Sequence, residues 1–344
     1  MQSFETLETY LSKKTSAADV PQAVADTVFA IASATIEIST IIARGRLAGD
    51  LGASRGDNAD GDVQKELDLV ANDIVIAALR DAPVAWIVSE ELQETMQGTV
   101  GAPLGVAIDP LDGSSNIDTN TSVGSIFSIL PAATGTADCT LQPGTQQLAA
   151  GYVIYGPQTS LVLTLGDGTM MFTLDPQDNI FRLTEPVIHI PESTREFAIN
   201  ASNFRHWDAP VRAYVDDCLN GEEGFHDRNY NMRWLASLVA ECHRILSRGG
   251  VFLYPADARK GYAAGRLRLL YEVNPIAFLV EQAGGAGTTG TKRLLEIEPV
   301  SIHERTPMIF GSRNEIARVE RYFEQTRMHA ERSQLFNKRG LFRA

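Results

Sequence analysis

Two carboxylates spaced three residues apart form the most informative chemical pattern in this chain, within residues 105–116. Asp109 and Asp112 follow an apolar run typical of a buried strand, where carboxylates are costly unless a cation or partner lies beside them. The Gly-Ser-Ser turn that comes next offers backbone N–H groups and hydroxyls, which suit a phosphate. The stretch indicates metal-assisted phosphate chemistry, although the two aspartates alone are also compatible with an Asx-type turn.

Further acids stand at the ends of three other segments. Glu90 and Glu91 end a strand-like run, Glu272 follows another apolar segment, and Asp62 and Asp68 lie where a loop passes into a helix. Taken singly, these acids are equally well explained as solvated strand ends or salt-bridge partners. Oxygen ligands favour Mg²⁺ or Mn²⁺, and the six histidines show no H-x-H or H-x-x-x-H spacing that would indicate Zn²⁺.

Bulk composition excludes several classes of protein. The 344 residues are 44% hydrophobic and 21% charged, as expected of a soluble globular protein with ample core. Thirty basic against 43 acidic residues give a net charge of −13, which argues against nucleic acid or an anionic membrane as the main partner. The three cysteines have no C-x-x-C spacing, and residues 1–16 contain no apolar signal-peptide core. We therefore expect a reduced, cytoplasmic location.

An alternation of helices and strands predicts an α/β fold made of helix and sheet layers. We expect helices at residues 21–44, 63–80, 209–219, 233–247, 274–283 and 313–326. We expect strands at residues 84–88, 125–130, 149–155, 160–165, 170–174, 250–254 and 307–311, and a strand followed by a turn within residues 105–116.

Two segments near the N-terminus need an interpretation of their own. The apolar positions of residues 24–42 recur at helical spacing, with Asp19 as a possible cap, Pro21 in the first turn and Gly45 after the end. This predicts one long core-facing helix and not a membrane span. The Gly- and Asp-rich loop at 49–62 fits a solvated surface loop as well as an active-site lid, and we favour the lid because it leads into Asp68.

At this point the motifs resemble a known family. SEE, DPLDGSSN, LQPG, AAGYVIYG, GGVFLYPAD and RLLYE-NP, spread over residues 89–275, are similar to the motifs of class I fructose-1,6-bisphosphatase, and the match runs from about residue 20 to 325. The resemblance implies a magnesium-dependent sugar bisphosphatase with the layered α/β sugar-phosphatase fold, usually a homotetramer. It implies an N-terminal subdomain (1–195) with most metal and catalytic residues. A C-terminal subdomain (196–326) would carry the sugar and far-phosphate site and one metal ligand, and a basic tail (327–344) would follow.

The resemblance also assigns roles to individual residues. Two or three Mg²⁺ ions per subunit, with Mn²⁺ as an alternative, would be held by Asp62, Glu90, Asp109, Asp112, Glu272 and the carbonyl of Leu111. Asp68 and Glu91 would help to deprotonate the attacking water. The 1-phosphate would contact Asp112, Gly113, Ser114, Ser115 and Asn116, and the far phosphate Asn200, Asn203, Trp234, Tyr254 and Arg266. Arg233 would reach in from a neighbouring subunit, although such a residue is more often a surface ion-pair partner.

The implied reaction is hydrolysis of the 1-phosphate of fructose 1,6-bisphosphate to fructose 6-phosphate and phosphate, in gluconeogenesis or the Calvin cycle. Asn203 and Trp234 stand where better-known members have tyrosine, and Arg266 where they have lysine. A sedoheptulose-1,7-bisphosphatase, or one enzyme serving both substrates in carbon fixation, is therefore the first alternative. A non-catalytic regulator that binds metal or sugar phosphate is the alternative outside the enzymes.

Regulation and the tail also yield expectations. Residues 16–20 and 103–104 lack the phosphate-binding donors of AMP-inhibited members, and Asp19 would repel the nucleotide, so we expect weak or absent AMP inhibition. The plastid form's cysteine-bearing insert is also missing, which makes thiol control improbable. The basic tail at 327–344 fits a solvated end, or a segment that docks on a neighbouring subunit.

Overall fold

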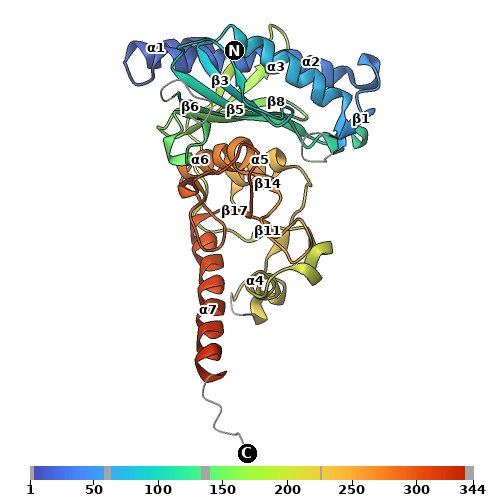
Figure 1. The fold of residues 1–344 in the computed structure, drawn as a ribbon, viewed down its shortest axis with the longest axis vertical. Coiled ribbons are helices and arrows are strands. Elements are labelled where there is room, and N and C mark those ends of the chain that lie inside the picture. The colour runs from blue at the N-terminus through green and yellow to red at the C-terminus, as the bar shows by residue number, and fades with distance from the viewer. Residues whose placement is uncertain (1–3, 58–62, 133–139, 225–226, 338–344) are drawn as a thin grey trace, which may run out of the picture.

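The computed structural model describes residues 4–57, 63–132, 140–224 and 227–337. The first half of the chain packs three helices on one large sheet (Figure 1). Its helices are α1 (Leu7–Ser16), α2 (Gln22–Arg44) and α3 (Glu66–Arg80). Its strands are β1 (Ser54–Asp57), β2 (Val63–Lys65), β3 (Val84–Ser89), β4 (Met96–Gln97), β5 (Leu104–Asp112), β6 (Val123–Pro131), β7 (Ala149–Tyr155), β8 (Thr159–Thr164), β9 (Thr169–Asp175) and β10 (Ile180–Glu185).

The second half contains a smaller sheet and the remaining helices. Its helices are α4 (Ala209–Asn220), α5 (Leu238–Arg248), α6 (Asn274–Gln282) and α7 (Arg313–Asn337). Its strands are β11 (Glu196–Ala198), β12 (Asn231–Met232), β13 (Val251–Tyr254), β14 (Leu267–Arg268), β15 (Ala286–Thr288), β16 (Arg305–Thr306) and β17 (Met308–Gly311). Short 3₁₀ turns lie at Ser114–Thr119 and Ala201–His206, and a π-helical turn at Leu269–Val273 leads into α6.

Helices and sheets alternate in five layers (Figure 1). The eight-stranded sheet has the order β10-β9-β8-β7-β6-β5-β3-β4, and the five-stranded sheet the order β12-β11-β13-β17-β15. One buried apolar cluster joins α1–α3 to the first sheet, a second joins that sheet through α5 and α6 to the second sheet, and a third lies between the second sheet, α4 and α7. The α/β layered sandwich predicted from the sequence is confirmed.

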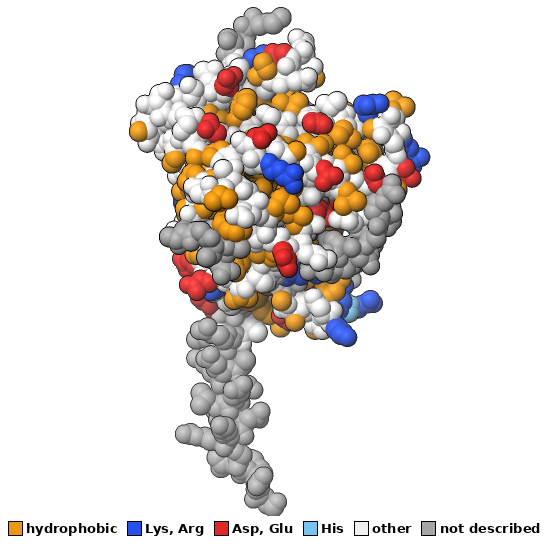
Figure 2. All heavy atoms as spheres, turned by 45° about the horizontal axis from the view of Figure 1, so that its top comes forward, with side chains coloured by type: hydrophobic (Ala, Val, Ile, Leu, Met, Phe, Trp, Pro, Cys, Tyr) orange, Lys and Arg blue, Asp and Glu red, His pale blue; other side chains and the backbone are white. Residues whose placement is uncertain are grey.

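Helix α2 is long and apolar enough to cross a membrane by length and composition alone. Its apolar stripe is instead used inside the protein, because Val24, Val28, Ile31 and Ile38 are fully buried in the first cluster. The prediction of a core-facing helix is therefore correct. Figure 2, which brings the α1–α3 layer toward the viewer, shows hydrophobic atoms scattered among polar ones over this layer.

Several predicted boundaries differ from the observed ones. Pro21 and not Asp19 occupies the cap position of α2, and it makes no side-chain capping hydrogen bond. The predicted loop at 49–62 contains β1, which pairs with β2 in an antiparallel hairpin, so α3 begins at Glu66 and not at 63. Helix α5 begins at Leu238, five residues later than expected, because the Ser237 hydroxyl accepts a hydrogen bond from Ala240 N and caps it.

Helix α1, edge strand β10 and several short strands are not predicted from the sequence, and α7 is longer than predicted. Helix α1 buries only Leu7 and Leu11, too few apolar positions to produce a clear helical pattern. Strand β10 lies at the edge of the eight-stranded sheet, next to β9. Helix α7 continues to Asn337, past the predicted end at 326 and into the segment expected as a tail, since residues 327–337 contain no glycine or proline to end it.

Gly124 on β6 marks a close contact between the first sheet and α5. A Cβ atom added there would lie 2.4 Å from the carbonyl oxygen of Val153 and 2.8 Å from both methyl groups of Val239. Only glycine lets the helix approach this closely. The contact also sets the position of Val239, whose backbone N–H lies 3.3 Å from Oδ2 of Asp112.

We predict that Gly124→Ala lowers the free energy of unfolding by about 1–3 kcal/mol, because overpacking must push α5 from the sheet. Chemical denaturation measures this change. Gly105→Ala on β5 is the matched control, since the nearest atom to its added Cβ lies 3.4 Å away, and this variant should be close to wild type. Equal stability of the two variants would contradict the interpretation of Gly124.

Candidate metal and phosphate site

The acids predicted from the sequence meet at one edge of the large sheet. Strands β3 and β5 are neighbours and run parallel, with Ser89 opposite Ile108, so their carboxyl ends lie at the same edge. Glu90 and Glu91 follow β3 directly, and Asp109 and Asp112 stand at the end of β5. The parallel pairing therefore places four carboxylates together, in a sheet whose other strand pairs are antiparallel.

A fifth acid comes from the second half of the chain. Carboxylate oxygens of Asp109, Asp112 and Glu272 all lie within 4.8 Å of one another, and all three residues are buried. Glu272 projects from the π-helical turn and accepts a hydrogen bond from the backbone N–H of Arg268 at 2.5 Å. Asp109 also accepts the Leu111 N–H at 2.9 Å, so it makes the Asx-type contact in addition to joining the cluster.

Burial and mutual repulsion disfavour the charged forms of these acids. Burial raises the pKa of Glu90 to about 7, while the Arg268 charge opposes this shift. Burial also raises the pKa of Asp112 to about 6, and burial together with the Glu90 charge puts the pKa values of Asp109 and Glu272 well above their usual range. A cluster with these properties can be fully ionised only if positive charge is added.

Asp68 and Glu91 lie beside the cluster. Asp68, in the first turn of α3, accepts the Lys65 N–H at 2.6 Å through Oδ2. Its Oδ1 is buried, and the Ser114 side chain also interacts with the carboxylate by a hydrogen bond that lowers its pKa. Burial raises the pKa of Asp68 to about 6, and the nearby Glu91 charge adds to the shift. Glu91 accepts a hydrogen bond from the side-chain amide of Gln64.

The carboxylates face a cavity of about 360 Å³. The residues that line it include Asp68, Glu90, Glu91, Asp109, Leu111, Asp112, Gly113, Ser114, Ser115, Tyr254, Arg266 and Glu272. Gly113 adopts a left-handed conformation (φ 77°) that turns the chain from β5 into the 3₁₀ turn carrying Ser114 and Ser115. The predicted metal and 1-phosphate residues thus share one cavity, except for Asn116, which bonds Ala236 O, and Asp62, which lies outside the described residues.

The residues predicted for a far phosphate divide into two groups. Asn200, Asn203, Tyr254 and Arg266 line a second recess, and the last two of these also line the acidic cavity, so the two spaces adjoin. Trp234 does not line either space. Its ring lies parallel to that of Tyr254 with centroids 6.2 Å apart. Arg233 is half exposed, and its Nε lies 3.5 Å from Glu196 of the same chain.

Several residues of the site were missed by sequence reasoning. Arg268 lies in the acidic cavity with its guanidinium 3.8 Å from Glu90, and Gln64 and Lys65 line the same cavity. Arg259 and Tyr262 line the second recess. A signal existed for Arg268, which is four residues from Glu272 and hence on the same face of a helical turn. The sequence contains no comparable signal for the others.

The donor set suits a hard divalent cation. It offers several carboxylate oxygens and the Leu111 carbonyl in a buried space, with no cysteine or histidine among the residues that line the cavity. Six acids line the cavity with only three cations, Lys65, Arg266 and Arg268, and this excess indicates that a further cation belongs there.

Comparison with known proteins gives a consistent result. The family model described as fructose-1-6-bisphosphatase, N-terminal domain, matches residues 6–186, and the model described as its C-terminal domain matches residues 190–324. Fructose-1,6-bisphosphatase class 1 from Methylobacterium radiotolerans is 54% identical over 341 residues, covering 98% of this chain and 97% of the relative. The same-named protein of Sinorhizobium medicae is 52% identical, covering 98% and 99%.

A solved structure is also similar. The crystal structure of Leishmania major fructose-1,6-bisphosphatase in holo form superimposes with a TM-score of 0.87 at 35% sequence identity. The match covers 94% of this chain and 100% of the Leishmania chain.

We predict that Asp112→Asn raises the melting temperature of the metal-free protein at pH 8 by a few degrees. Raised carboxyl pKa values mean that the folded chain holds protons that the unfolded chain releases. Stability therefore falls as pH rises from about 4 toward the folded values near 6–7. The amide keeps an acceptor for Val239 N–H but removes one charge.

The gain should disappear at pH 5, where the wild-type carboxyl is mostly protonated, and added Mg²⁺ should stabilise wild type more than the variant. Thermal melts in chelator and in Mg²⁺ at both pH values measure these effects. Asp73→Asn on the exposed face of α3 is the control and should change neither response. A variant that melts below wild type in chelator at pH 8 would contradict the repulsion argument.

Proposed function

Since the chain belongs to the class 1 fructose-1,6-bisphosphatase family, we propose that its acidic cavity is the active site and that the adjoining recess holds the sugar and its second phosphate. The chain hydrolyses fructose 1,6-bisphosphate to fructose 6-phosphate and phosphate, and the prediction of a sugar-bisphosphate phosphatase is confirmed. The regulator alternative loses its support. The observation that carries the site proposal is the buried cluster of Asp109, Asp112 and Glu272 facing the cavity.

Members of the family depend on a metal, and we assign Mg²⁺ to this site, with two or three ions per subunit. The proposed ligands are Asp62, Glu90, Asp109, Asp112, Glu272 and the Leu111 carbonyl. When bound, such cations neutralise the phosphate, make a water more acidic and stabilise the departing sugar alkoxide. The support is the number of carboxylates in the cavity, which exceeds what Lys65, Arg266 and Arg268 can neutralise.

In the proposed mechanism, Asp68 and Glu91 take the proton from the attacking water. Oδ2 of Asp68 accepts the Lys65 N–H, so the proton would go to the buried Oδ1, and the Ser114 side chain also interacts with this carboxylate. A pKa near 6 lets Asp68 be mostly ionised at neutral pH yet still basic enough to accept a proton. Gln64 donates a hydrogen bond that orients Glu91, and the charge of Glu91 raises the pKa of Asp68.

The two phosphates would be bound in different ways. The 1-phosphate would lie against Gly113, Ser114 and Ser115, whose turn offers N–H groups and hydroxyls. The far phosphate would be bound by Asn200, Asn203, Tyr254 and Arg266 at the recess, with Arg266 able to donate two parallel hydrogen bonds. Trp234 would support the ring of Tyr254 and not bind phosphate itself.

We assign the protein to homo-oligomers, with a tetramer as the expected form and Arg233 reaching a neighbouring site. Two features support this assignment. Three arginines, Arg233, Arg244 and Arg248, surround Glu196. This leaves a local excess of positive charge beside the half-exposed Arg233, which could reach a neighbouring subunit. Phe29 and Ile180 are exposed and line a cavity of about 130 Å³. A reduced, cytoplasmic location is consistent with the free thiols of Cys218 and Cys242, both buried.

The experiment that tests the site is phosphate release from fructose 1,6-bisphosphate in Mg²⁺ by wild type and Asp68→Asn. We predict that the variant loses about 100-fold or more in kcat while its KM changes little. The amide has the shape of the carboxylate and still accepts hydrogen bonds, but it cannot take a proton from water. Asp73→Asn on the same helix is the control and should retain full activity. A fully active Asp68→Asn would contradict the assignment.

Sedoheptulose 1,7-bisphosphate, assayed beside the six-carbon substrate, tests the alternative. A strong preference for fructose 1,6-bisphosphate would exclude the dual role. Comparable kcat/KM values for both sugars would support it and would give Asn203 a role in accepting the longer chain.

We also predict that submillimolar AMP inhibits phosphate release by less than about tenfold. Helix α2 begins at Gln22 after Pro21, which provides no side-chain cap, and Asp19 is about half exposed and pairs with Lys14 at 3.5 Å. The acidic side chain near the helix start disfavours a second anion. An inhibition curve with AMP measures this, and Asp19→Asn should bind the nucleotide better if the repulsion argument is right.

A further inference from the structure

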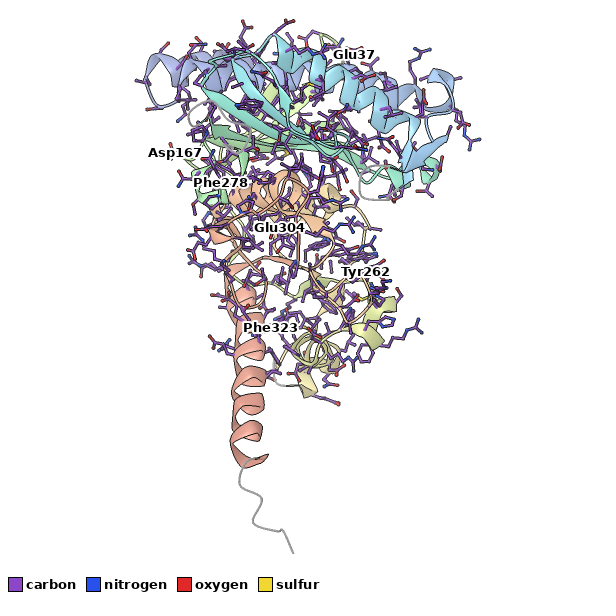
Figure 3. All side chains as sticks on the ribbon, in the orientation of Figure 1. Glu37, Asp167, Tyr262, Phe278, Glu304 and Phe323 are labelled. Atoms are coloured by element: carbon purple, nitrogen blue, oxygen red, sulfur yellow. The ribbon has the colours of Figure 1, made fainter. Side chains whose placement is uncertain are left out.

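Tyr262 lies between β13 and β14, in a loop at the outer side of the second half of the chain (Figure 3). Two guanidinium groups lie over its ring: the Cζ atom of Arg259 is 4.3 Å from the ring centroid and that of Arg266 is 4.8 Å away. Both distances are within the range of favourable cation–π contact. All three side chains line the recess assigned to the far phosphate.

The two arginines differ in their other partners. Arg259 binds the carboxylate of Asp257 through Nε, at 3.0 Å to each oxygen, and also through Nη2. Asp257 is nearly buried, and its own backbone N–H donates to Tyr262 O at 3.2 Å. Arg259 is therefore neutralised and fixed in place, and it also helps to hold the ring of Tyr262.

Arg266 has no such carboxylate. Its side chain is exposed, and its guanidinium forms no ion pair or side-chain hydrogen bond with any residue that the structure describes. It is also the cation that lines both the recess and the acidic cavity. An exposed arginine without a partner samples many rotamers, and fixing it when a ligand binds costs free energy. The Tyr262 ring is the contact that restrains it.

The hydroxyl of Tyr262 has no hydrogen-bond partner in the described part of the chain. The ring face, and not the hydroxyl, is therefore what this residue contributes. A phenylalanine at this position would preserve the contact, whereas an aliphatic side chain of similar size would fill the space without attracting the cation.

We propose that Tyr262 is a positioning residue for the far phosphate. Its ring, held from one side by the Arg259–Asp257 pair, preorganises the Arg266 guanidinium at the junction of the two spaces. Tyr262 then sets affinity for substrates that carry a second phosphate and leaves the chemistry at the 1-phosphate unchanged. This inference rests on the proposed function, because it needs the recess to hold that phosphate.

The test compares Tyr262→Leu and Tyr262→Phe on two substrates, fructose 1,6-bisphosphate and fructose 1-phosphate, which lacks the far phosphate. For the bisphosphate, Tyr262→Leu should raise KM about three- to tenfold with kcat within about twofold, and Tyr262→Phe should restore the wild-type KM. For fructose 1-phosphate, the leucine variant should match wild type. Lys260→Gln removes an exposed cation from the same loop and is the matched control.

A second measurement asks whether Tyr262 acts through Arg266. In an Arg266→Gln background, Tyr262→Leu should add less than about twofold to KM, because the cation that the ring positions is gone. An unchanged KM in Tyr262→Leu, an equal loss on both substrates, or full additivity with Arg266→Gln would each overturn the proposal. Lack of phosphate release by wild type would instead overturn the proposed function, so the two failures are distinguishable.

Discussion

Repulsion among buried carboxylates is the constraint on which the rest of this structure depends. Asp109, Asp112 and Glu272 crowd within 4.8 Å, with Glu90 beside them and Arg268 as the nearest opposing cation. Without a metal, burial and mutual repulsion raise the pKa values of these groups and favour their protonated forms. The fold must therefore supply enough packing elsewhere to tolerate the cluster, and the five-layer arrangement with three large apolar clusters does so.

The scaffold holds the acids by backbone contacts as well as by packing. The parallel pairing of β3 with β5 fixes where Glu90 and Asp109 emerge, and α5 presents the Val239 N–H to Asp112. The α5 contact depends on Gly124, where no side chain fits. Glu272 reaches the same place from a π-helical turn, a geometry that is rare and often found at functional sites. The two halves of the chain thus meet at the proposed active site, one supplying most of the acids and the other Glu272 and the recess.

Much of the fold could be predicted because long periodic segments carry a strong signal. Helix α2 and strands β5–β9 were placed to within a few residues, whereas α1, with two buried side chains, was missed. The late start of α5 was also missed, because the Ser237 cap competes with an apparently helical stretch before it. For the site, the motif resemblance identified every acid that the cavity brings together, but it did not place the Trp234 ring behind Tyr254 or predict the Tyr262 contacts.

The sequence by itself determined the class of chemistry: oxygen donors at several strand ends beside a Gly-Ser-Ser turn, together with the motif resemblance, indicate metal-assisted attack on a phosphate. Such motifs are local, since residue type and short spacing define the donors. Only the tertiary structure decided which distant residues meet them. Arg268 opposes Glu90, Gln64 orients Glu91, and Arg266 joins the two spaces, because sheet pairing and loop packing bring together segments far apart in the chain. Contacts of that kind depend on how the layers stack, which no short stretch of sequence encodes.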